Sequence, residues 1–174
     1  MPRSASRGPV PFAVRRPPKS SAGHATGAQL LPALRAHAVR LLARREYSRA
    51  ELESRLIAKG ASREQAASLL DELARLGYQS DARFALAFTT HNARRYSRRS
   101  ITAELKMKGV SADAIDSALT ESPLDDAQAL EALWQRRFGR IPTDERDKAR
   151  QVRFLQSRGF SVSAILALLC KAKA

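Results

Sequence analysis

One seven-residue phrase occurs three times in this chain of 174 residues, at nearly constant spacing. The copies occupy 56–62, 105–111 and 155–161, and each reads leucine, two variable residues, lysine or arginine, glycine, an apolar residue and serine. The steps between them are 49 and 50 residues (105 − 56 and 155 − 105). A period of this size indicates a tandem array of one supersecondary unit. Such arrays usually bind extended partners along their length and seldom enclose a catalytic pocket.

Each copy of the phrase predicts a helix end, a sharp turn and a new helix start. Glycine at C′ takes a left-handed conformation that a side chain disfavours, and the apolar residue after it packs back on the last helical turn. Serine then caps the next helix, and Ser62 with Gln65 forms a capping box. The expected C′ glycines are Gly60, Gly109 and Gly159, and the expected N-caps are Ser62, Ser111 and Ser161.

A second motif, Tyr-Ser-Arg at 47–49 and 96–98, stands nine residues before the leucine that opens the first and second phrases. We interpret each serine as the N-cap of another helix, and we expect Ser48 to form a capping box with Glu51. The tyrosine at N′ is placed to pack on the apolar residue at N4, as a hydrophobic staple. We therefore assign both tyrosines to stapling rather than to stacking on nucleic-acid bases.

The third unit departs from this spacing. Phe-Gly-Arg at 138–140 looks like a third version of the tyrosine motif, but it lies 17 residues before Leu155. The unit thus carries about eight extra residues, which begin near the helix-breaking Pro142. We expect Pro123 at N1 and Asp125 at N3 of the helix that opens this unit.

The chain predicts an all-α fold, an elongated helical array of three tandem three-helix repeats, because period-two runs of β-branched and aromatic residues are absent. We divide it into a disordered, basic, proline-rich tail (1–29) and repeats at 30–79, 80–121 and 122–174. Each repeat is too small to bury a full core alone, so we expect neighbours to stack or to share faces. The helices are expected near 32–45, 48–59, 62–76, 81–95, 97–108, 111–120, 123–138, 143–158 and 161–172.

The net charge of the chain indicates which kind of partner it binds. It is +14, from 31 Lys and Arg against 17 Asp and Glu. The excess is +5 in 1–29 and +3 in each of 30–80, 81–120 and 121–174. A positive charge spread evenly over the repeats is expected of a protein that lies along a polyanion or an acidic groove.

Clusters of arginine at the predicted helix corners are the candidate binding residues, because guanidinium groups suit phosphate and carboxylate oxygens alike. If the repeats stack in constant orientation, the three corners form a basic stripe along one side. The alternative is that these side chains are solvated and pair with local acids such as Glu46. The candidates are Arg44, Arg45 and Arg49, then Arg94, Arg95, Arg98 and Arg99, and finally Arg136, Arg137 and Arg140.

The sequence offers no catalytic constellation, so we expect no enzyme activity, no cofactor and no metal. His24, His37 and His91 stand apart from other ligand types, and Asp125 with Asp126 suits the first turn of a helix. The single cysteine, Cys170, is expected in the core, and a chain without a disulfide framework fits the cytoplasm. No apolar run approaches the ~20 residues of a membrane span.

Four segments together resemble the bacterial RecX family: 44–60, 77–85, 101–110 and 155–165. The resemblance covers roughly residues 33–170. It implies tandem three-helix repeats that modulate the RecA recombinase, usually as inhibitors, by binding in the groove of the RecA–DNA filament. It also implies single- and double-stranded DNA as partners, and we expect a monomer. Gln79-Ser80 departs from the apolar-acidic pair often found there, and the tail lies outside the family core.

A second function stays open at this point. Paired helices with a tight turn are also typical of helix-turn-helix proteins, so a DNA-binding transcription or architectural factor is the alternative. Against it, the positions that would enter a DNA groove, 63–65, 112–114 and 162–164, are mixed or acidic rather than basic and amide-rich.

Overall fold

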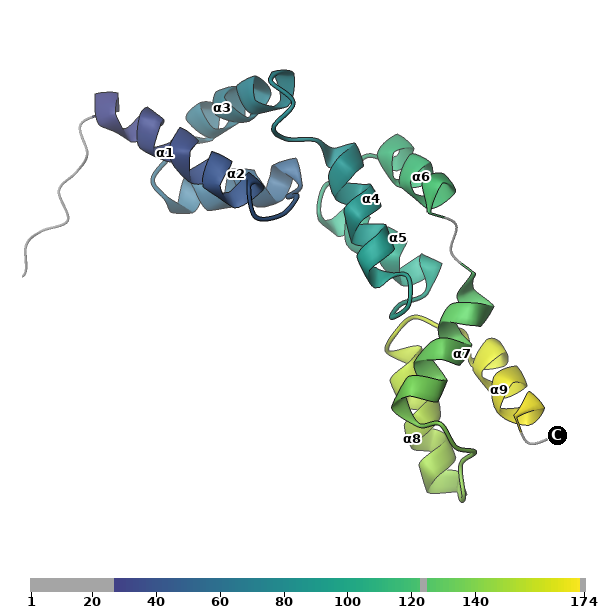
Figure 1. Cartoon of the computed structure of the whole chain (residues 1–174). Coiled ribbons are helices and arrows are strands. Elements are labelled where there is room, and N and C mark those ends of the chain that lie inside the picture. The colour runs from purple at the N-terminus through teal and green to yellow at the C-terminus, as the bar shows by residue number, and fades with distance from the viewer. Residues whose placement is uncertain (1–26, 123–124, 173–174) are drawn as a thin grey trace, which may run out of the picture.

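A computed structural model describes residues 27–122 and 125–172 of the chain. Within these residues all regular structure is helical, in three successive groups of three that follow one another along an elongated, curved body (Figure 1). The all-α array of tandem three-helix repeats is therefore confirmed. The helices are α1 (Gly27–Leu42), α2 (Arg49–Ala58), α3 (Arg63–Arg75), α4 (Asp81–Asn92), α5 (Arg98–Met107), α6 (Ala112–Glu121), α7 (Asp126–Arg137), α8 (Glu145–Gln156) and α9 (Val162–Lys171).

The first helix begins earlier than the sequence indicates. It starts at Gly27, so Pro32 lies inside it and its first turn overlaps the end of the predicted tail. The prediction of a disordered tail falls otherwise on residues 1–26, which lie outside the described residues. Pro32 removes one amide donor from the helix and is tolerated most easily near a helix start.

The helix caps predicted by the repeated phrase are present. Gly60, Gly109 and Gly159 have φ of 98°, 76° and 90°. Serines cap helices α2 to α6 and α9, and the reciprocal capping box of Ser62 and Gln65 is complete. These turns depend on residues at most five apart, which explains why the local sequence predicts them.

The second expected capping box, that of Ser48 and Glu51, is wrong. The hydroxyl of Ser48 does accept the amide N–H of Glu51, at 3.2 Å. The carboxylate of Glu51, however, accepts from the ammonium group of Lys108 at 2.8 Å, in the next repeat. A charged partner from outside the helix has replaced the backbone amide, since charge-assisted hydrogen bonds are the stronger ones.

The start of the third repeat also differs from the prediction. Asp125 is the N-cap of α7 rather than its N3 residue, and it accepts the amides of Ala127 and Gln128. Phe138 ends α7 instead of preceding α8, whose N-cap is Asp144. The extra residues lengthen the α7–α8 linker and extend α8 at its N-terminal end, to 12 residues against 10 in α2 and α5. The 138–140 segment is therefore not the structural counterpart of the tyrosine motif.

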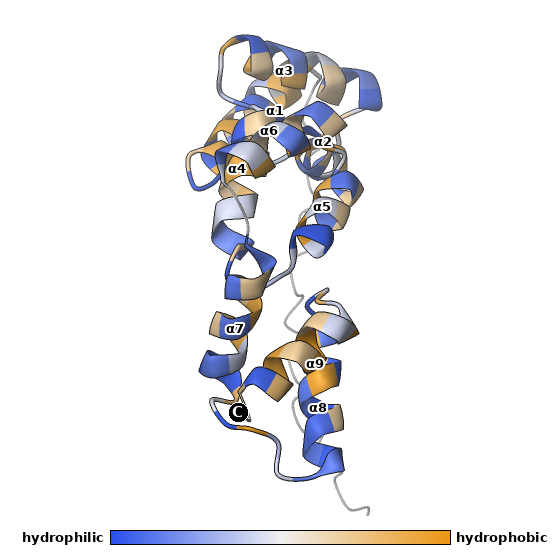
Figure 2. Cartoon of the chain, turned by 90° about the vertical axis from the view of Figure 1, so that its right-hand side faces the viewer, coloured by the Kyte–Doolittle hydropathy of each residue, from blue (hydrophilic) through white to orange (hydrophobic). Residues whose placement is uncertain are grey.

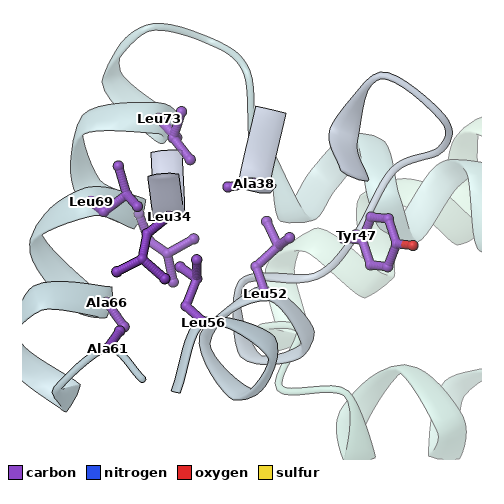
Figure 3. Close-up of a cluster of buried hydrophobic side chains, with 10 residues drawn as sticks. Leu34, Ala38, Tyr47, Leu52, Leu56, Ala61, Ala66, Leu69 and Leu73 are labelled. Atoms are coloured by element: carbon purple, nitrogen blue, oxygen red, sulfur yellow. The ribbon is translucent and has the colours of Figure 1, made fainter. Parts of the chain in front are cut away.

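Each repeat encloses a hydrophobic core of its own. Figure 3 shows the first, where Leu34 of α1, Leu52 of α2 and Leu69 of α3 meet. Tyr47 is only 7% exposed and belongs to this cluster, and Tyr96 packs against the second cluster together with Ile101. Each tyrosine thus lies in the core that also contains its predicted staple partner, Leu52 or Ile101.

Neighbouring repeats stack, which is one of the two arrangements expected, but they do not share an apolar face. The buried apolar residues form three separate clusters, one in each repeat, and the closest helix pairs all lie within a repeat. The surfaces where repeats meet are polar, as described below. Within the third repeat, α9 is mostly hydrophobic and α8 mostly hydrophilic (Figure 2).

Cys170 is exposed, contrary to its expected place in the core. The buried stripe of α9 consists of Ile165 and Leu169, four residues apart. One residue further along a helix turns the side chain by about 100°, which places position 170 off this stripe. The apolar run that contains Cys170 thus misled the interpretation, because a run does not distinguish the faces of a helix.

Candidate interaction surface

The arginine corners lie between the first and second helices of each repeat. The corners of repeats 1 and 2 face the next repeat, and the corner of repeat 3 lies at the end of the body away from repeat 1 (Figure 1). We call the meeting of repeats 1 and 2 the first junction and that of repeats 2 and 3 the second junction.

One kind of contact occurs at both junctions. At the first, the carboxylate of Asp81 accepts the backbone N–H of Arg49 at 2.8 Å. At the second, the carboxylate of Asp126 accepts the backbone N–H of Arg98 at 2.7 Å. In both, an acid from the first turn of one repeat caps the second helix of the repeat before it, where a negative charge complements the helix dipole.

Ion pairs complete the first junction. Glu46 pairs with Arg83 at 2.8 Å, and Glu51 pairs with Lys108 at 2.8 Å. Gln79 is buried and donates to the Asp81 carboxylate at 2.8 Å. This side chain is therefore part of the polar junction.

The second junction is built mainly on backbone and aromatic contacts. The amide of Ser97 donates to the carbonyl oxygen of Arg158 at 3.0 Å, and its hydroxyl donates to the carbonyl oxygen of Gly159 at 2.9 Å. The guanidinium of Arg158 donates to the phenol oxygen of Tyr96 at 2.6 Å and lies 5.0 Å from the centre of that ring. The third copy of the phrase therefore docks directly on the second corner.

Arginines of the first corner are largely occupied by local partners. The guanidinium of Arg45 lies 3.8 Å from the centre of the Tyr47 ring and 3.9 Å from the carboxylate of Glu51. Arg49 pairs with Asp71 at 2.8 Å. Arg44 is exposed and makes no ion pair within the described residues. Local pairing, the alternative weighed above, describes two of these three side chains.

The second corner is different. Arg94, Arg95, Arg98 and Arg99 are all exposed, and none of them forms an ion pair within residues 27–122 and 125–172. Their positive charge is therefore available to a partner. The carbonyl oxygen of Arg94 accepts from the guanidinium of Arg136 at 3.4 Å, which brings one arginine of the third corner beside the second.

The remaining arginines of the third corner lie farther along α7 and its linker. The guanidinium of Arg137 lies 5.6 Å from the ring centres of both Phe138 and Phe154. Arg140 pairs with Asp147 at 3.0 Å. The structure thus brings Arg136 to the second corner and leaves Arg140 with a group of arginines on α8.

Sequence reasoning missed that group on α8. Arg146, Arg150 and Arg153 follow one another at steps of four and three residues, which places them on one face of the helix. With Arg140 they line a single pocket. The helical spacing of the three arginines was the available signal, and it was hidden because they do not form a contiguous run.

Asp147 organises this group. Burial by itself would raise the pKa of its carboxyl group, but the hydrogen bonds from Arg150 and from the amide of Thr143, with the charges of Arg140 and Arg150, outweigh that effect and hold the pKa below its usual value. The carboxylate therefore stays ionised at neutral pH, and it holds two guanidinium groups in place.

The part of the chain that the structure describes holds no group of three or more His, Cys, Asp and Glu side chains placed to bind a metal ion. None of its helices has both the length and the apolar character needed to cross a membrane.

Comparison with known proteins places the chain in a family. Models of the first, second and third three-helix domains of RecX match residues 35–73, 80–119 and 125–169. The chain is 41% identical over 136 residues to the Regulatory protein RecX of Chromobacterium violaceum, covering 78% of this chain and 88% of that protein. It is 41% identical over 141 residues to the Regulatory protein RecX of Pseudomonas fluorescens, covering 80% and 91%.

A solved structure agrees with this placement at the level of the fold. The crystal structure of RecX from Lactobacillus salivarius superposes with a TM-score of 0.64 at 17% sequence identity, over 84% of this chain and 98% of that chain. The three domain models, the sequence identities and the shared fold lead to one conclusion: this chain belongs to the RecX family.

Proposed function

We propose that this protein is a regulator of the RecA recombinase that acts as an inhibitor. It binds in the groove of the RecA–DNA filament and limits filament extension, ATP hydrolysis and strand exchange in DNA repair and recombination. Membership of a family of regulatory proteins is the observation that carries this proposal. The protein acts as a monomer in the bacterial cytoplasm, without catalysis of its own.

The shape of the molecule supports a partner that is itself extended. Three repeats with separate cores follow one another along the body, so no repeat covers the outer surface of another (Figure 1). An array of this kind presents a long, shallow surface to a filament and contacts several of its subunits at once. Binding energy then comes from many modest polar contacts, distributed over the repeats.

Charge indicates where the contact is centred. The second corner holds four exposed arginines without carboxylate partners in the described residues, and Arg136 lies beside it. Guanidinium groups bind phosphate oxygens of DNA and carboxylates of a protein surface with the same fork geometry. We therefore place the main contact with the filament at the second junction, with the first corner in a secondary role because its arginines are mostly paired.

The alternative, a helix-turn-helix transcription or architectural factor, is less well supported. The second helix of each tight turn would have to read a DNA groove. The first turn of α6 carries Asp113 and no cation, and Val162 opens α9 with 43% of its surface exposed. The starts of α6 and α9 thus offer neither the positive charge nor the amide groups that base edges require. In α3, Arg63 is followed by the acid Glu64, and the amide of Gln65 is engaged in the capping box.

The test is an assay of RecA. The protein is added to RecA on single-stranded DNA, ATP hydrolysis is followed, and filament length is measured by electron microscopy. Inhibition at substoichiometric amounts with shorter filaments is expected. Unchanged RecA activity at equal stoichiometry, combined with sequence-selective binding of duplex DNA, would replace the proposal with the transcription factor.

A further inference from the structure

The α7–α8 linker and the first turns of α8 enclose a pocket of about 460 Å³. Arg140 reaches it from the linker, and Arg146, Arg150 and Arg153 reach it from α8. The pocket lies in the segment by which the third repeat is longer than the other two. It is not part of either junction, so its arginines serve no contact between repeats.

Two of the four guanidinium groups are held in fixed positions. Asp147, which is 8% exposed, pairs with Arg140 at 3.0 Å and also with Arg150. These contacts use only some of the N–H groups of the two arginines, since a guanidinium has five donors, and the others are left for a ligand. A binding site gains affinity when its groups are positioned before the ligand arrives.

The other two cations supply the charge. Within the described residues, neither Arg146 nor Arg153 pairs with a carboxylate. The second acid of the pocket, Asp144, is engaged as the N-cap of α8 and accepts the amide of Asp147 at 2.7 Å. Four arginines against two aspartates leave a net charge of +2 on the lining (4 − 2). The pocket is therefore suited to a divalent or multiply charged anion.

The chemistry of the lining narrows the ligand further. It contains arginine, aspartate and threonine side chains but no aromatic ring and no side-chain amide. The lining therefore has no aromatic platform on which a base could stack. Its forked guanidinium donors fit the oxygens of a phosphate group, and such a contact positions a strand without selecting its sequence.

We propose that this pocket is a phosphate-binding site that holds the backbone of a nucleic-acid strand at the end of the array. Two arginines placed by Asp147 orient the phosphate oxygens, and Arg146 with Arg153 attract the strand. The inference deepens the proposed function and rests on it only in assuming that a strand lies within reach. Its test contains no RecA, so failure of either idea leaves the other standing.

The decisive variant is R146A/R153A, which removes the two unpaired cations and spares the pairs of Asp147. The matched control, K59A/R75A, removes two exposed cations of repeat 1, at the ends of α2 and α3. Affinity for a fluorescent duplex and for a single strand is measured over a salt series. For the duplex, the log–log salt slope of R146A/R153A should shrink by up to ~1.8, about 0.9 for each lost phosphate contact, while the control changes less.

Two further arms separate the possible outcomes. R146K/R153K keeps the charges but loses the forks, so it should restore most of the salt slope while binding more weakly than the wild type. Equal weakening by K59A/R75A would overturn the pocket in favour of general charge. Sodium pyrophosphate, followed through arginine Nε–H resonances, tests the other source of the same chemistry. If pyrophosphate binds and DNA affinity is unaffected by R146A/R153A, a free phosphate compound is the ligand and the nucleic-acid assignment is wrong.

Discussion

The first junction joins repeats 1 and 2 mainly through ion pairs between side chains, whereas the second joins repeats 2 and 3 through backbone carbonyls and the stacking of Arg158 on Tyr96. One contact is common to both, the acid that caps the second helix of the preceding repeat. The same repeated unit has thus produced two interfaces of different chemistry. The difference decides which arginines are neutralised and which stay available.

The acids at the first corner explain the contrast. Glu46 and Glu51 lie there and engage Arg83, Lys108 and Arg45. The second corner has Arg95 and Ser100 at the corresponding places, and only the backbone of Arg98 meets an acid. A junction made of partly exposed ion pairs weakens as salt rises, while close backbone contacts are screened much less. The first junction is therefore the salt-sensitive one.

The largest expected effect comes from the glycines of the phrase. A Cβ on Gly159 would lie 2.5 Å from the hydroxyl oxygen of Ser97 and against that of Ser100, in addition to the strain of φ +90°. Gly159→Ala should cost about 2–5 kcal/mol, the sum of left-handed strain and overpacking. Gly60→Ala, with open space around it, should cost only about 1–2 kcal/mol.

Urea unfolding of both variants checks this ranking. Gly109→Ala, whose Cβ would lie 3.1 Å from that of Ala50, should fall between them. Equal losses at all three positions would show that the glycines act through the turn alone and that the second junction is not as close as described.

The next largest effect is expected on DNA binding and RecA inhibition when the arginines of the second corner are removed. Changing Arg94, Arg95, Arg98 and Arg99 together to alanine should leave melting nearly unchanged, because these side chains are exposed. The salt slope of duplex binding should shrink by up to ~3.6 if all four touch phosphate, at about 0.9 for each contact, and RecA inhibition should fall.

Two matched variants sharpen that comparison. R40A/K59A/R75A/K171A removes four exposed cations elsewhere and should keep most RecA inhibition. R45A/R49A should lower stability more than DNA affinity, because both side chains are engaged within the protein. Loss of DNA binding with intact RecA inhibition in the second-corner variant would move the filament contact to another face.

A smaller effect is expected when the ion pairs of the first junction are neutralised. Glu46→Gln with Glu51→Gln should cost on the order of 1 kcal/mol, because the pairs are partly exposed and each carboxylate leaves one oxygen without a hydrogen bond. Distances between spin labels on repeats 1 and 2 should broaden, and those between repeats 2 and 3 should not. Equal broadening at both junctions would contradict the division drawn here.

Lowering the pH should produce the smallest change in stability. The residue responsible, Asp147, lies outside both junctions. The pKa of Asp147 is lowered in the folded protein, so its contribution to stability is present above the unfolded value of about 3.9 and is lost as pH falls through the folded pKa. The difference in melting temperature between the wild type and Asp147→Asn should therefore shrink below about pH 4. A constant difference down to pH 2 would show that the carboxylate is not charged in the native state.

Much of the fold follows from residues close together in the sequence. The glycine turns, the serine caps, the stapling tyrosines and the helical stripe of buried positions such as Leu56, Leu105 and Leu155 each depend on a few neighbouring residues. Their period also predicts three repeats, and four such segments in order are enough to indicate the RecX family. These features can be predicted without the tertiary structure because the residues that interact in each of them are at most one or two helical turns apart.

Tertiary structure decided how the repeats meet and which arginines remain free. The carboxylate of Glu51 accepts from Lys108, 57 residues away, and not from the backbone of its own helix. The hydroxyl of Ser97 donates to Gly159, 62 residues away. The grouping of Arg140 with α8 likewise depends on the path of a linker that no local motif specifies. These contacts depend on how whole elements of the chain are placed relative to one another. Because a side chain can bond only to groups that this placement brings within a few ångströms, its partner cannot be read from neighbouring residues.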